Sequence, residues 1–326
     1  MVVGISIVNY KTADLTIKCL QSLVSERELI NFEVIVVDND SKNGSFEKIS
    51  LAIKSEGWSE WAQVVDSGHN GGFAFGNNIA IRQFFEQNEP PEFIYLLNPD
   101  TYICANAVNK LATFMQQNLK VGIAGSRIEE PDGTPQSSSF KFHTCITELD
   151  RGFSFGPITK LLAPWVDLHQ IAEHAEKTDW VSGASMMIRR EVFEQVGLLD
   201  EAYFMYFEET DFCLHATRAN WKCWYVPESR VVHYVGQSTG ITNSQTVTKK
   251  MPNYWFDSRR RYFLKNYGII HTVLADVFWL IGFSTWKIRN FFQKKPHSHP
   301  PHLLKDSFMH SFFIRGIKVL PVKNKF

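Results

Sequence analysis

The chain of 326 residues has few of the features that mark a secreted or metal-stapled protein. Its five cysteines are odd in number and scattered, and no two have the spacing of a zinc-binding pair. The first residues, MVVGISIVNY, carry no basic flank and are typical of a strand rather than of a secretory signal. We therefore expect free thiols in a reducing compartment, which favours the cytoplasm.

The common glycine-rich nucleotide motifs are also missing. There is no GK[ST] of a P-loop, and the first strand is followed by NYKTAD instead of a GxGxxG turn. A dinucleotide-binding dehydrogenase is therefore disfavoured. A nucleotidyltransferase is disfavoured too, because it needs a Gly-rich, basic loop directly after the first strand.

Net charge is formally zero, but the charges are unevenly distributed. Residues 287–326 contain nine Lys/Arg and one acid, Asp306, so the rest of the chain holds 25 basic and 33 acidic residues. With 44% hydrophobic and 14% aromatic residues, the chain is typical of a packed globular protein. The basic C-terminal segment is expected to have a role separate from the acidic remainder.

Apolar runs of strand length alternate with helical patterns over the first 130 residues. Strands are predicted at 2–10, 32–40, 61–68, 93–100 and 121–128, and helices at 12–25, 45–55, in the second half of 68–87, and at 107–118. Such alternation predicts an α/β fold whose mostly parallel sheet is covered by helices on both faces. Residues 131–180 are expected to be an irregular excursion, after which a strand (180–188) and a helix (190–197) resume the pattern.

Polar residues stand where three of these segments end or begin. Asp38 and Asp40 follow the second strand, and Asn98-Pro99-Asp100 follows the fourth. Acidic residues also open a helix at about 208–220. Carboxylates at the carboxyl ends of parallel strands suit a metal and nucleotide site. Such residues also form ordinary turns, and acids complement the dipole of a helix start.

Two further features could belong to the same site. The glycines of GHNGGFAFGNN, residues 68–78, permit close approach of the backbone to a ligand before a helix begins, or they serve only as a structural turn. His233 follows a short apolar strand, where it could reach a metal or phosphate, or could be an ordinary hydrogen-bonded residue.

The composition changes from about Tyr254. An apolar run from Ile269 to Trp286 is near the minimum length for a bilayer span, but the Asp276 within it is costly there. The tail beyond mixes basic and aromatic residues. Either this region lies on an anionic membrane surface, or it is a helical extension packed on the domain with a solvated basic face. We expect a catalytic domain at 1–250 and the extension at 251–326.

Taken together, residues 3–240 resemble the inverting glycosyltransferases of family 2, nearest to the bacterial rhamnosyltransferase-like branch. The resemblance rests on the order of IVNYKTADL, VIVVDNDS, NGGFAFGNN, LLNPD, the long segment from WVSGASMMI to ATRANW, and VVH. It implies a GT-A fold with a C-terminal helical extension, a nucleoside diphosphate sugar donor and inversion at the anomeric carbon.

Roles carried over by the resemblance fall on particular residues of this chain. Asp38 matches the acid that binds the pyrimidine base, and Glu209 matches the general base. Asp100 matches the metal ligand, with His233 as a second ligand or a contact to the diphosphate. Two positions depart from the common pattern: Asn98 replaces the first acid of the metal motif, and Glu209 stands where many relatives have Asp.

The full expectation is a glycosyltransferase that uses Mg²⁺ or Mn²⁺ and transfers a sugar to a hydroxyl of a cell-surface glycan or lipid-linked acceptor. Rhamnose from thymidine diphosphate rhamnose is the first choice of donor, with uridine diphosphate sugars as the second. A non-catalytic nucleotide- or sugar-binding module is the alternative. Candidate donor-binding residues are Asn9, Asp38, Asp40, Asn70, Gly71, Gly72, Asn77 and Asn98, and candidate acceptor residues are Trp180, Gly183, Glu208 and Asp211.

Overall fold

The computed structural model describes residues 2–168, 171–234, 250–293 and 299–318, which form two compact units. The first unit comprises Met1–Phe140, Ile171–Glu201 and Glu208–Gly240, and the second comprises Lys141–Gln170, Ala202–Phe207 and Ile241–Phe326. The second unit thus takes in two internal segments besides the expected C-terminal extension. Parts of the predicted basic tail, residues 294–298 and 319–326, lie outside the described residues.

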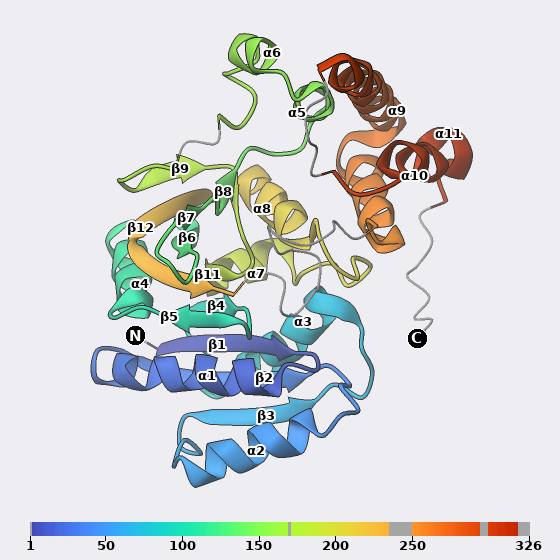
Figure 1. Ribbon diagram of the computed structural model, residues 1–326. Coiled ribbons are helices and arrows are strands. Elements are labelled where there is room, and N and C mark those ends of the chain that lie inside the picture. Colours follow the sequence, from blue (N-terminus) through green and yellow to red (C-terminus); the bar gives the residue numbers. More distant parts are fainter. Residues whose placement is uncertain (1, 169–170, 235–249, 294–298, 319–326) are drawn as a thin grey trace. The chain divides into compact units, whose positions relative to one another are not determined.

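A mixed sheet forms the centre of the first unit (Figure 1). Within the described residues its main strand order is β3-β2-β1-β4-β11-β6-β12-β5. The bounds are β1 (Val2–Asn9), β2 (Asn31–Asp38), β3 (Ala62–Asp66), β4 (Phe93–Leu97), β5 (Thr101–Ile103), β6 (Val121–Glu129), β11 (Ser185–Arg189) and β12 (Lys222–His233). The strands β3-β2-β1-β4 are parallel, whereas β11 is antiparallel to both neighbours. The α/β class is confirmed, in a sheet that is mixed and not parallel throughout.

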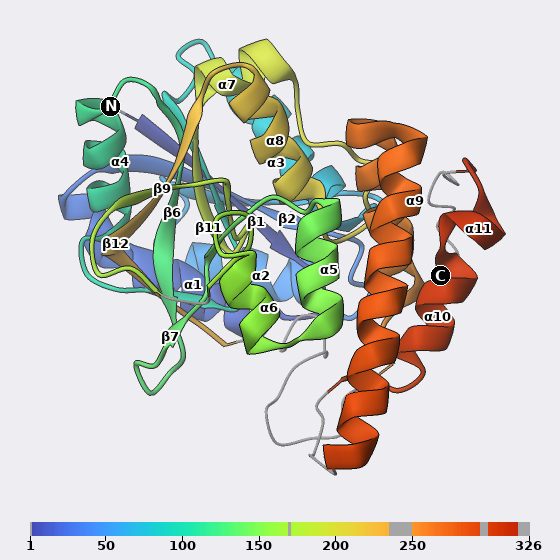
Figure 2. The same ribbon diagram turned by 90° about the horizontal axis from the view of Figure 1, so that it is seen from above.

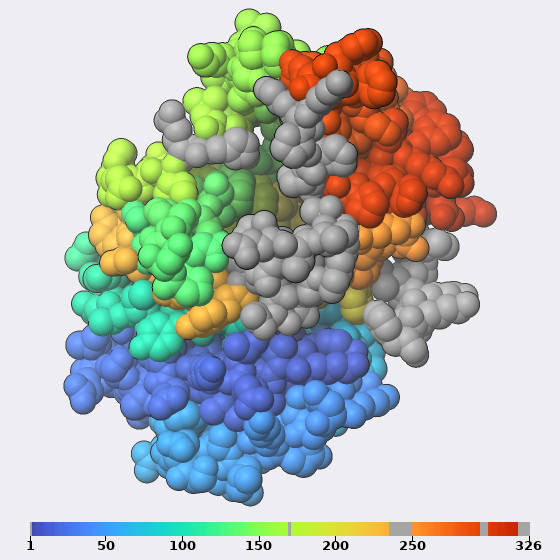
Figure 3. Space-filling view, viewed as in Figure 1, coloured from blue at the N-terminus to red at the C-terminus, as the bar shows by residue number. Residues whose placement is uncertain are grey.

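Helices cover both faces of this sheet. They are α1 (Ala13–Leu23), the 3-10 turn η1 (Val24–Glu28), α2 (Ser45–Ser55), α3 (Gly72–Phe85), α4 (Ala107–Gln117), α7 (Arg190–Val196) and α8 (Glu208–Arg218). Successive side chains of a strand point to opposite faces, and β1 shows this clearly. Ile5 and Ile7 join the core cluster that includes residues of α1, α2 and α4, whereas Gly4 faces α3, where an added Cβ would lie 2.9 Å from the ring of Phe84. In Figure 3 the blue atoms of the segments that contain α1 and α2 cover the lower part of the visible surface.

The expectation that residues 131–180 are irregular was wrong for much of that segment. It contains β7 (Pro135–Gln136), β8 (Ser139–Phe140), α5 (Cys145–Phe153), α6 (Gly156–Leu161) and β9 (Glu176–Thr178). β8 pairs with β10 (Trp180–Val181), and β7 and β9 pair with strands of the main sheet. Helix α5 begins with a capping box between Thr144 and Thr147, which satisfies backbone N–H groups at the helix start.

The second unit is helical. Its longest element, α9 (Asn253–Gln293), contains a non-helical residue, Gly268, at φ 78°. Figure 2 shows α9 flanked by α5 on one side and by α10 (Leu303–His310) and α11 (Phe312–Arg315) on the other. Helices α5 and α9 approach closely through glycines, since a Cβ on Gly282 would lie 2.7 Å from the backbone nitrogen of Phe153.

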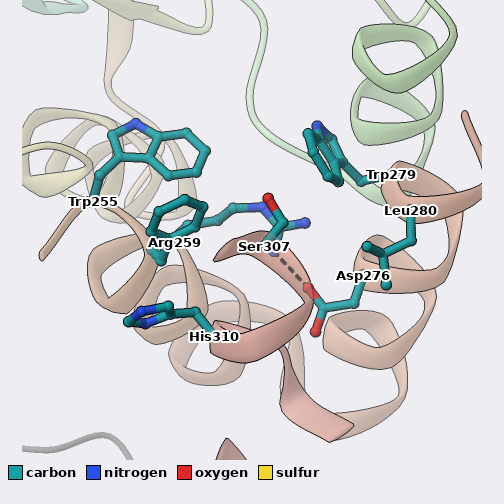
Figure 4. A pocket seen from close by; sticks show the side chains of 8 residues that line it. Trp255, Arg259, Asp276, Trp279, Leu280, Ser307 and His310 are labelled. Carbon is teal, nitrogen blue, oxygen red and sulfur yellow. Dashed lines mark hydrogen bonds and ion pairs between the residues drawn. The ribbon is translucent and has the colours of Figure 1, made fainter. Parts of the chain in front are cut away.

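A buried ion-pair cluster joins these helices, and part of it appears in Figure 4. The Arg259 guanidinium donates to Asp276 Oδ1 at 2.6 Å and, through Nε, to Glu148 Oε2 at 2.8 Å. Asp276 Oδ2 in turn accepts from the backbone N–H of Phe312 at 2.7 Å. The Asp that interrupts the apolar run is therefore paired inside the helical unit, where it links α9 to α11.

By length and composition alone, α9 is the one helix in the described ranges that could cross a membrane. Only 28% of its apolar window is buried. Its packing on α5 and α10 shows the expected helical extension, and a membrane contact stays a proposal.

Candidate active site

The carboxyl ends of β1 and β2 place Asn9 and Asp38 side by side. The two residues are partners in the parallel register of these strands, and both are buried. Asn9 Nδ2 donates to Asp38 Oδ1 at 2.5 Å, while Asn9 Oδ1 accepts from the hydroxyl of Thr16 at 2.9 Å. The carboxylate is thereby held in one orientation at the rim of the sheet.

Ser41 completes this arrangement and was not among the predicted site residues. Its hydroxyl donates to Asp38 Oδ1 at 2.6 Å and its backbone N–H donates to Asp38 Oδ2 at 3.1 Å. The hydroxyl also accepts from the backbone N–H of Lys11 at 2.8 Å. The sequence signal was present, because a Ser three residues after an Asp commonly closes a turn by such bonds.

The glycine-rich loop joins the same rim through Asn39. The Asn39 amide donates to Asn70 Oδ1 at 3.0 Å and to the carbonyl of Gly72 at 3.1 Å. Asn70 Oδ1 also accepts from the N–H of Gly72, which has φ 89° and begins α3 after Gly71. Asn39 Oδ1 is buried and has no hydrogen-bond partner among the described residues.

Asp40 lies near the surface of the first unit, whereas Asn77 is buried. Asp40 has φ 59° and pairs with Lys42 at 3.1 Å near the surface. Asn77 is buried, accepts from the hydroxyl of Ser6 at 2.7 Å and donates to the carbonyl of Phe73 at 3.0 Å. The bond to Ser6 thus holds α3 against β1, whereas the bond to Phe73 lies within α3.

Asp100 and His233 meet although 133 residues separate them. β12 is antiparallel to β5 with His233 opposite Thr101, and this register brings His233 Nε2 to 3.2 Å from Asp100 Oδ1. The amide of Asn98 lies 3.5 Å from the same nitrogen. Three predicted residues from two segments therefore converge at one point.

This group fits a divalent cation in part. Two adjacent ligands of an octahedral Mg²⁺, each about 2.1 Å from the ion, lie about 3.0 Å apart. Asp100 Oδ1 and His233 Nε2 are 3.2 Å apart, which is close to this value. In the described ranges, no set of three His, Cys, Asp or Glu residues is placed to hold a metal. A cation here would hence share its coordination with oxygens from a bound molecule, as hard divalent cations do with phosphates.

A cavity of about 450 Å³ adjoins Asp100. Its wall comes from α1, from β5 and from the residue that follows β12, and comprises Leu15, Lys18, Gln21, Ser22, Asp100, Thr101, Tyr102 and Tyr234. The cavity shows that the rim near Asp100 is hollowed on the α1 side.

Glu209 lies in the first turn of α8, beside the loop before β11. Its Oε2 is shielded from solvent and has no hydrogen-bond partner among the described residues. Burial raises the pKa of Glu209, and the N–H groups of Glu209 and Gly183 offset only part of that rise. A carboxyl group with a raised pKa and a free acceptor oxygen is suited to take up a proton.

Gly183 lies close to both Glu209 and the aromatic ring of Phe73. A Cβ at Gly183 would lie 3.2 Å from that ring and 3.8 Å from Glu209 Oε1. The next residue, Ala184, accepts a hydrogen bond at its carbonyl from the backbone N–H of Asn98 at 3.0 Å. The glycine-rich loop, the helix that carries Glu209 and the Asp100–His233 pair are thus linked by direct contacts within the first unit.

The remaining acceptor candidates surround this point. Glu208 and Asp211 are buried, whereas Glu209 is only partly covered, as expected when Glu208 and Asp211 share one helix face. Trp180 stacks on Phe140, with ring centroids 4.4 Å apart and planes at 27°, across the β10–β8 pair. Phe140 was not predicted, because its strand pairing is not visible in its own sequence.

Comparisons with known proteins show which sequences and folds this chain is similar to. Residues 4–197 match the sequence model of glycosyl transferase family 2. The chain is 32% identical over 219 residues to the low-salt glycan biosynthesis hexosyltransferase Agl10 of Haloferax volcanii, covering 67% of this chain and 62% of that protein. It is 27% identical over 231 residues to the N-acetylglucosaminyl-diphospho-decaprenol L-rhamnosyltransferase of Mycobacterium tuberculosis, covering 67% and 71%. The matched part of this chain therefore spans about three fifths of the length of the Haloferax protein.

Solved structures show the same fold at low sequence identity. GalNAc-T7, crystallised with UDP, GalNAc and Mn²⁺, has a TM-score of 0.60 and 16% identity over 97% of this chain and 56% of that chain. Residues 1–349 of S. aureus TarS with UDP-GlcNAc give a TM-score of 0.52 and 16% identity over 95% of this chain and 82% of that one. The expected GT-A fold is confirmed by these neighbours.

Proposed function

Because the chain belongs to glycosyl transferase family 2, we propose that it transfers a sugar from a nucleoside diphosphate sugar to an acceptor hydroxyl with inversion. The observation that carries the proposal is the linked set of Glu209, Gly183, Ala184, Asn98 and Asp100. The contacts within this set support a site in which the carboxyl of Glu209 accepts a proton while Asp100 and His233 hold a cation. Both are needed when a hydroxyl attacks and a diphosphate leaves.

Glu209 is the general base of this proposal. As the acceptor oxygen attacks the anomeric carbon, the bond between that carbon and the diphosphate oxygen breaks with its electron pair on the diphosphate. The hydroxyl proton passes to a Glu209 oxygen, for which the unpartnered Oε2 is available. Attack from the face opposite the leaving group inverts the anomeric centre.

The rim formed by β1, β2 and the glycine-rich loop holds the nucleotide in this proposal. Asp38 faces the base with its orientation fixed by Asn9 and Ser41. Asp40, Asn70, Gly71 and Gly72 line the donor, since the glycines leave the backbone open to a ligand. Asn77 supports the same loop from inside.

Asp100 and His233, with Asn98 beside them, would hold Mg²⁺ or Mn²⁺. A divalent cation bound there neutralises negative charge on the diphosphate. The carboxyl of Asp100 is buried, and a cation bound there would replace its hydrogen bond to His233 Nε2.

The similar proteins suggest the donor and acceptor. The name of the Mycobacterium protein specifies rhamnosyl transfer to N-acetylglucosaminyl-diphospho-decaprenol. Another relative, 28% identical, is named Rhamnosyltransferase WbbL in Escherichia coli. We infer that thymidine diphosphate rhamnose is the first donor to test, ahead of uridine diphosphate sugars. We also infer that the acceptor is a cell-surface glycan or lipid-linked sugar, bound near Trp180, Gly183, Glu208 and Asp211 on the cytoplasmic face of the membrane.

A donor screen tests the proposal. Nucleoside diphosphate sugars are added to the purified chain with Mn²⁺, and the shift in unfolding temperature is measured for each. A ligand that binds only the folded state at 100 times its Kd adds about 2.7 kcal/mol of stability. The stabilising donor is then incubated with rhamnosyl and N-acetylglucosaminyl acceptors, and transfer is followed by mass spectrometry. Donor binding without transfer to any acceptor, or to water, would favour the non-catalytic binding module.

A further inference from the structure

One face of α9 carries an exposed apolar stripe, broken by Ser284 and Thr285. It consists of Ile270, Leu274, Ile281, Ile288 and Phe292, all exposed, with Phe292 at 77% and Ile270 at 74%. At 100° per residue these five side chains fall within an arc of about 40°, and 22 residues of helix extend for about 33 Å. Solvated surfaces rarely hold an apolar stripe of this length, which marks an interaction surface.

The opposite face of α9 is fixed to its own unit. Thr272, Ala275, Gly282 and Phe283 are buried there, and Asp276 is paired with Arg259. A spanning orientation would break that ion pair or draw the charged side chains of α5 into hydrocarbon, which is costly. The helix can instead lie in the plane of an interface with one face buried and the other retained by α5 and α10.

The charges that flank the stripe in the sequence, rather than on the same helix face, point to its partner. Between residues 266 and 286 the only charged side chain is the buried Asp276, whereas Lys265 and Lys287 stand exposed just outside. Residues 287–326 carry nine Lys/Arg and one acid. The described tail also exposes Phe308, Phe313 and Ile317 among these cations. Basic and apolar side chains together are the pattern that anionic lipid headgroups attract.

We propose that the stripe on α9 docks this protein in the plane of an anionic lipid bilayer. A second copy of the chain is a poorer partner, because pairing through this face would bring two strongly basic tails together. The docking deepens the membrane-surface part of the proposed function, but it does not depend on the chemistry at Glu209.

Vesicle flotation with the full chain tests this inference. The wild type is expected to float with vesicles of phosphatidylcholine and phosphatidylglycerol, and less with phosphatidylcholine alone. A double variant, Ile281→Glu with Ile288→Glu, should lower partitioning on the mixed vesicles at least about tenfold. The matched control places the same two charges at Leu51 and Leu119, which are 68% and 73% exposed in the first unit, and should partition like the wild type.

Circular dichroism and unfolding temperature establish that both double variants fold. Transfer to a water-soluble acceptor should be unchanged in the α9 variant, and Glu209→Gln should still float, so failure of docking and failure of catalysis are distinguishable. The proposal is overturned if the wild type does not float, if the α9 variant floats equally well, or if alkaline carbonate fails to extract the bound wild type. It is also overturned if the α9 substitutions turn a dimer into a monomer without changing flotation.

Discussion

Replacing Glu209 by Gln removes the proton acceptor while keeping the shape of the side chain. We expect the rate of transfer to fall about 10²–10⁴-fold, the usual contribution of a general base, which corresponds to about 2.7–5.5 kcal/mol in the activation barrier. Donor binding should be unchanged, because the contacts given for Asp38, Asn39 and Asp100 do not involve Glu209. The measurement compares initial transfer rates with donor affinity from titration calorimetry. Glu60→Gln, an exposed residue of the first unit, is the matched control.

The pH dependence follows from the raised pKa of Glu209. Glu209 must be ionised to accept a proton, so kcat/KM should fall as the pH drops through a pKa that lies above the usual range of a glutamate. Gln cannot titrate, so the residual activity of Glu209→Gln should lose this acidic limb. A variant whose pH profile keeps the same limb would show that another group is the base.

The same substitution has a predictable effect on stability. Between the usual glutamate pKa and the raised one, the folded state binds more protons than the unfolded state, so the free energy of unfolding falls as the pH rises through that window. At neutral pH the wild type carries the cost of a shielded charge that Gln avoids. Glu209→Gln should therefore be at least as stable as the wild type in urea unfolding at pH 7. A clearly less stable variant would refute the claim that Glu209 is held in a desolvating environment.

Three other substitutions test separate parts of the structure. Asp100→Asn should abolish the dependence of donor binding on Mn²⁺ while leaving the apo protein folded. Calorimetry with and without the ion measures this dependence. Donor binding that still responds to Mn²⁺ would contradict the assignment of Asp100 as a ligand. Arg259→Met leaves Asp276 buried without its cation and should cost about 3–5 kcal/mol in unfolding free energy; a loss under about 1 kcal/mol would mean that the pair is solvated. Gly183→Ala places a methyl group 3.2 Å from the Phe73 ring, and should lower the transfer rate more than donor affinity; equal losses in both would place Gly183 in the donor site instead.

The sequence predicted the parallel half of the sheet well. Strands such as β1 and β2 are buried on both faces and so read as continuous apolar runs, and α2 occupies the predicted residues 45–55. The orientation of β11 could not be read in the same way, because a buried strand has the same pattern in either direction. Helix α5 was missed although Ile146, Leu149 and Phe153 stand at helical spacing, because it spans only nine residues between segments rich in Gly, Pro and Ser.

Some residues of the candidate site could likewise be predicted from local sequence, whereas others depend on long-range pairing. Asp38, Asp100 and Glu209 stand next to strand ends or helix starts, so their positions were accessible from local patterns together with the family resemblance. Ser41 could have been found from turn chemistry. The approach of His233 to Asp100 depends on the β12–β5 register, and the stacking of Phe140 on Trp180 depends on the β8–β10 pair. Such long-range pairings are set by the whole core and leave no mark in the nearby sequence.

The hydrogen bond from the backbone N–H of Asn98 to the carbonyl of Ala184 extends the antiparallel ladder between β4 and β11 by one residue. As a result, the segment that leads to the cation ligands and the segment that leads to Gly183 are anchored on adjacent strands of one buried pair. A shift of β11 by one residue along β4 would move Gly183 away from the turn that carries Asn98, so the register of this one strand pair sets the spacing of both segments.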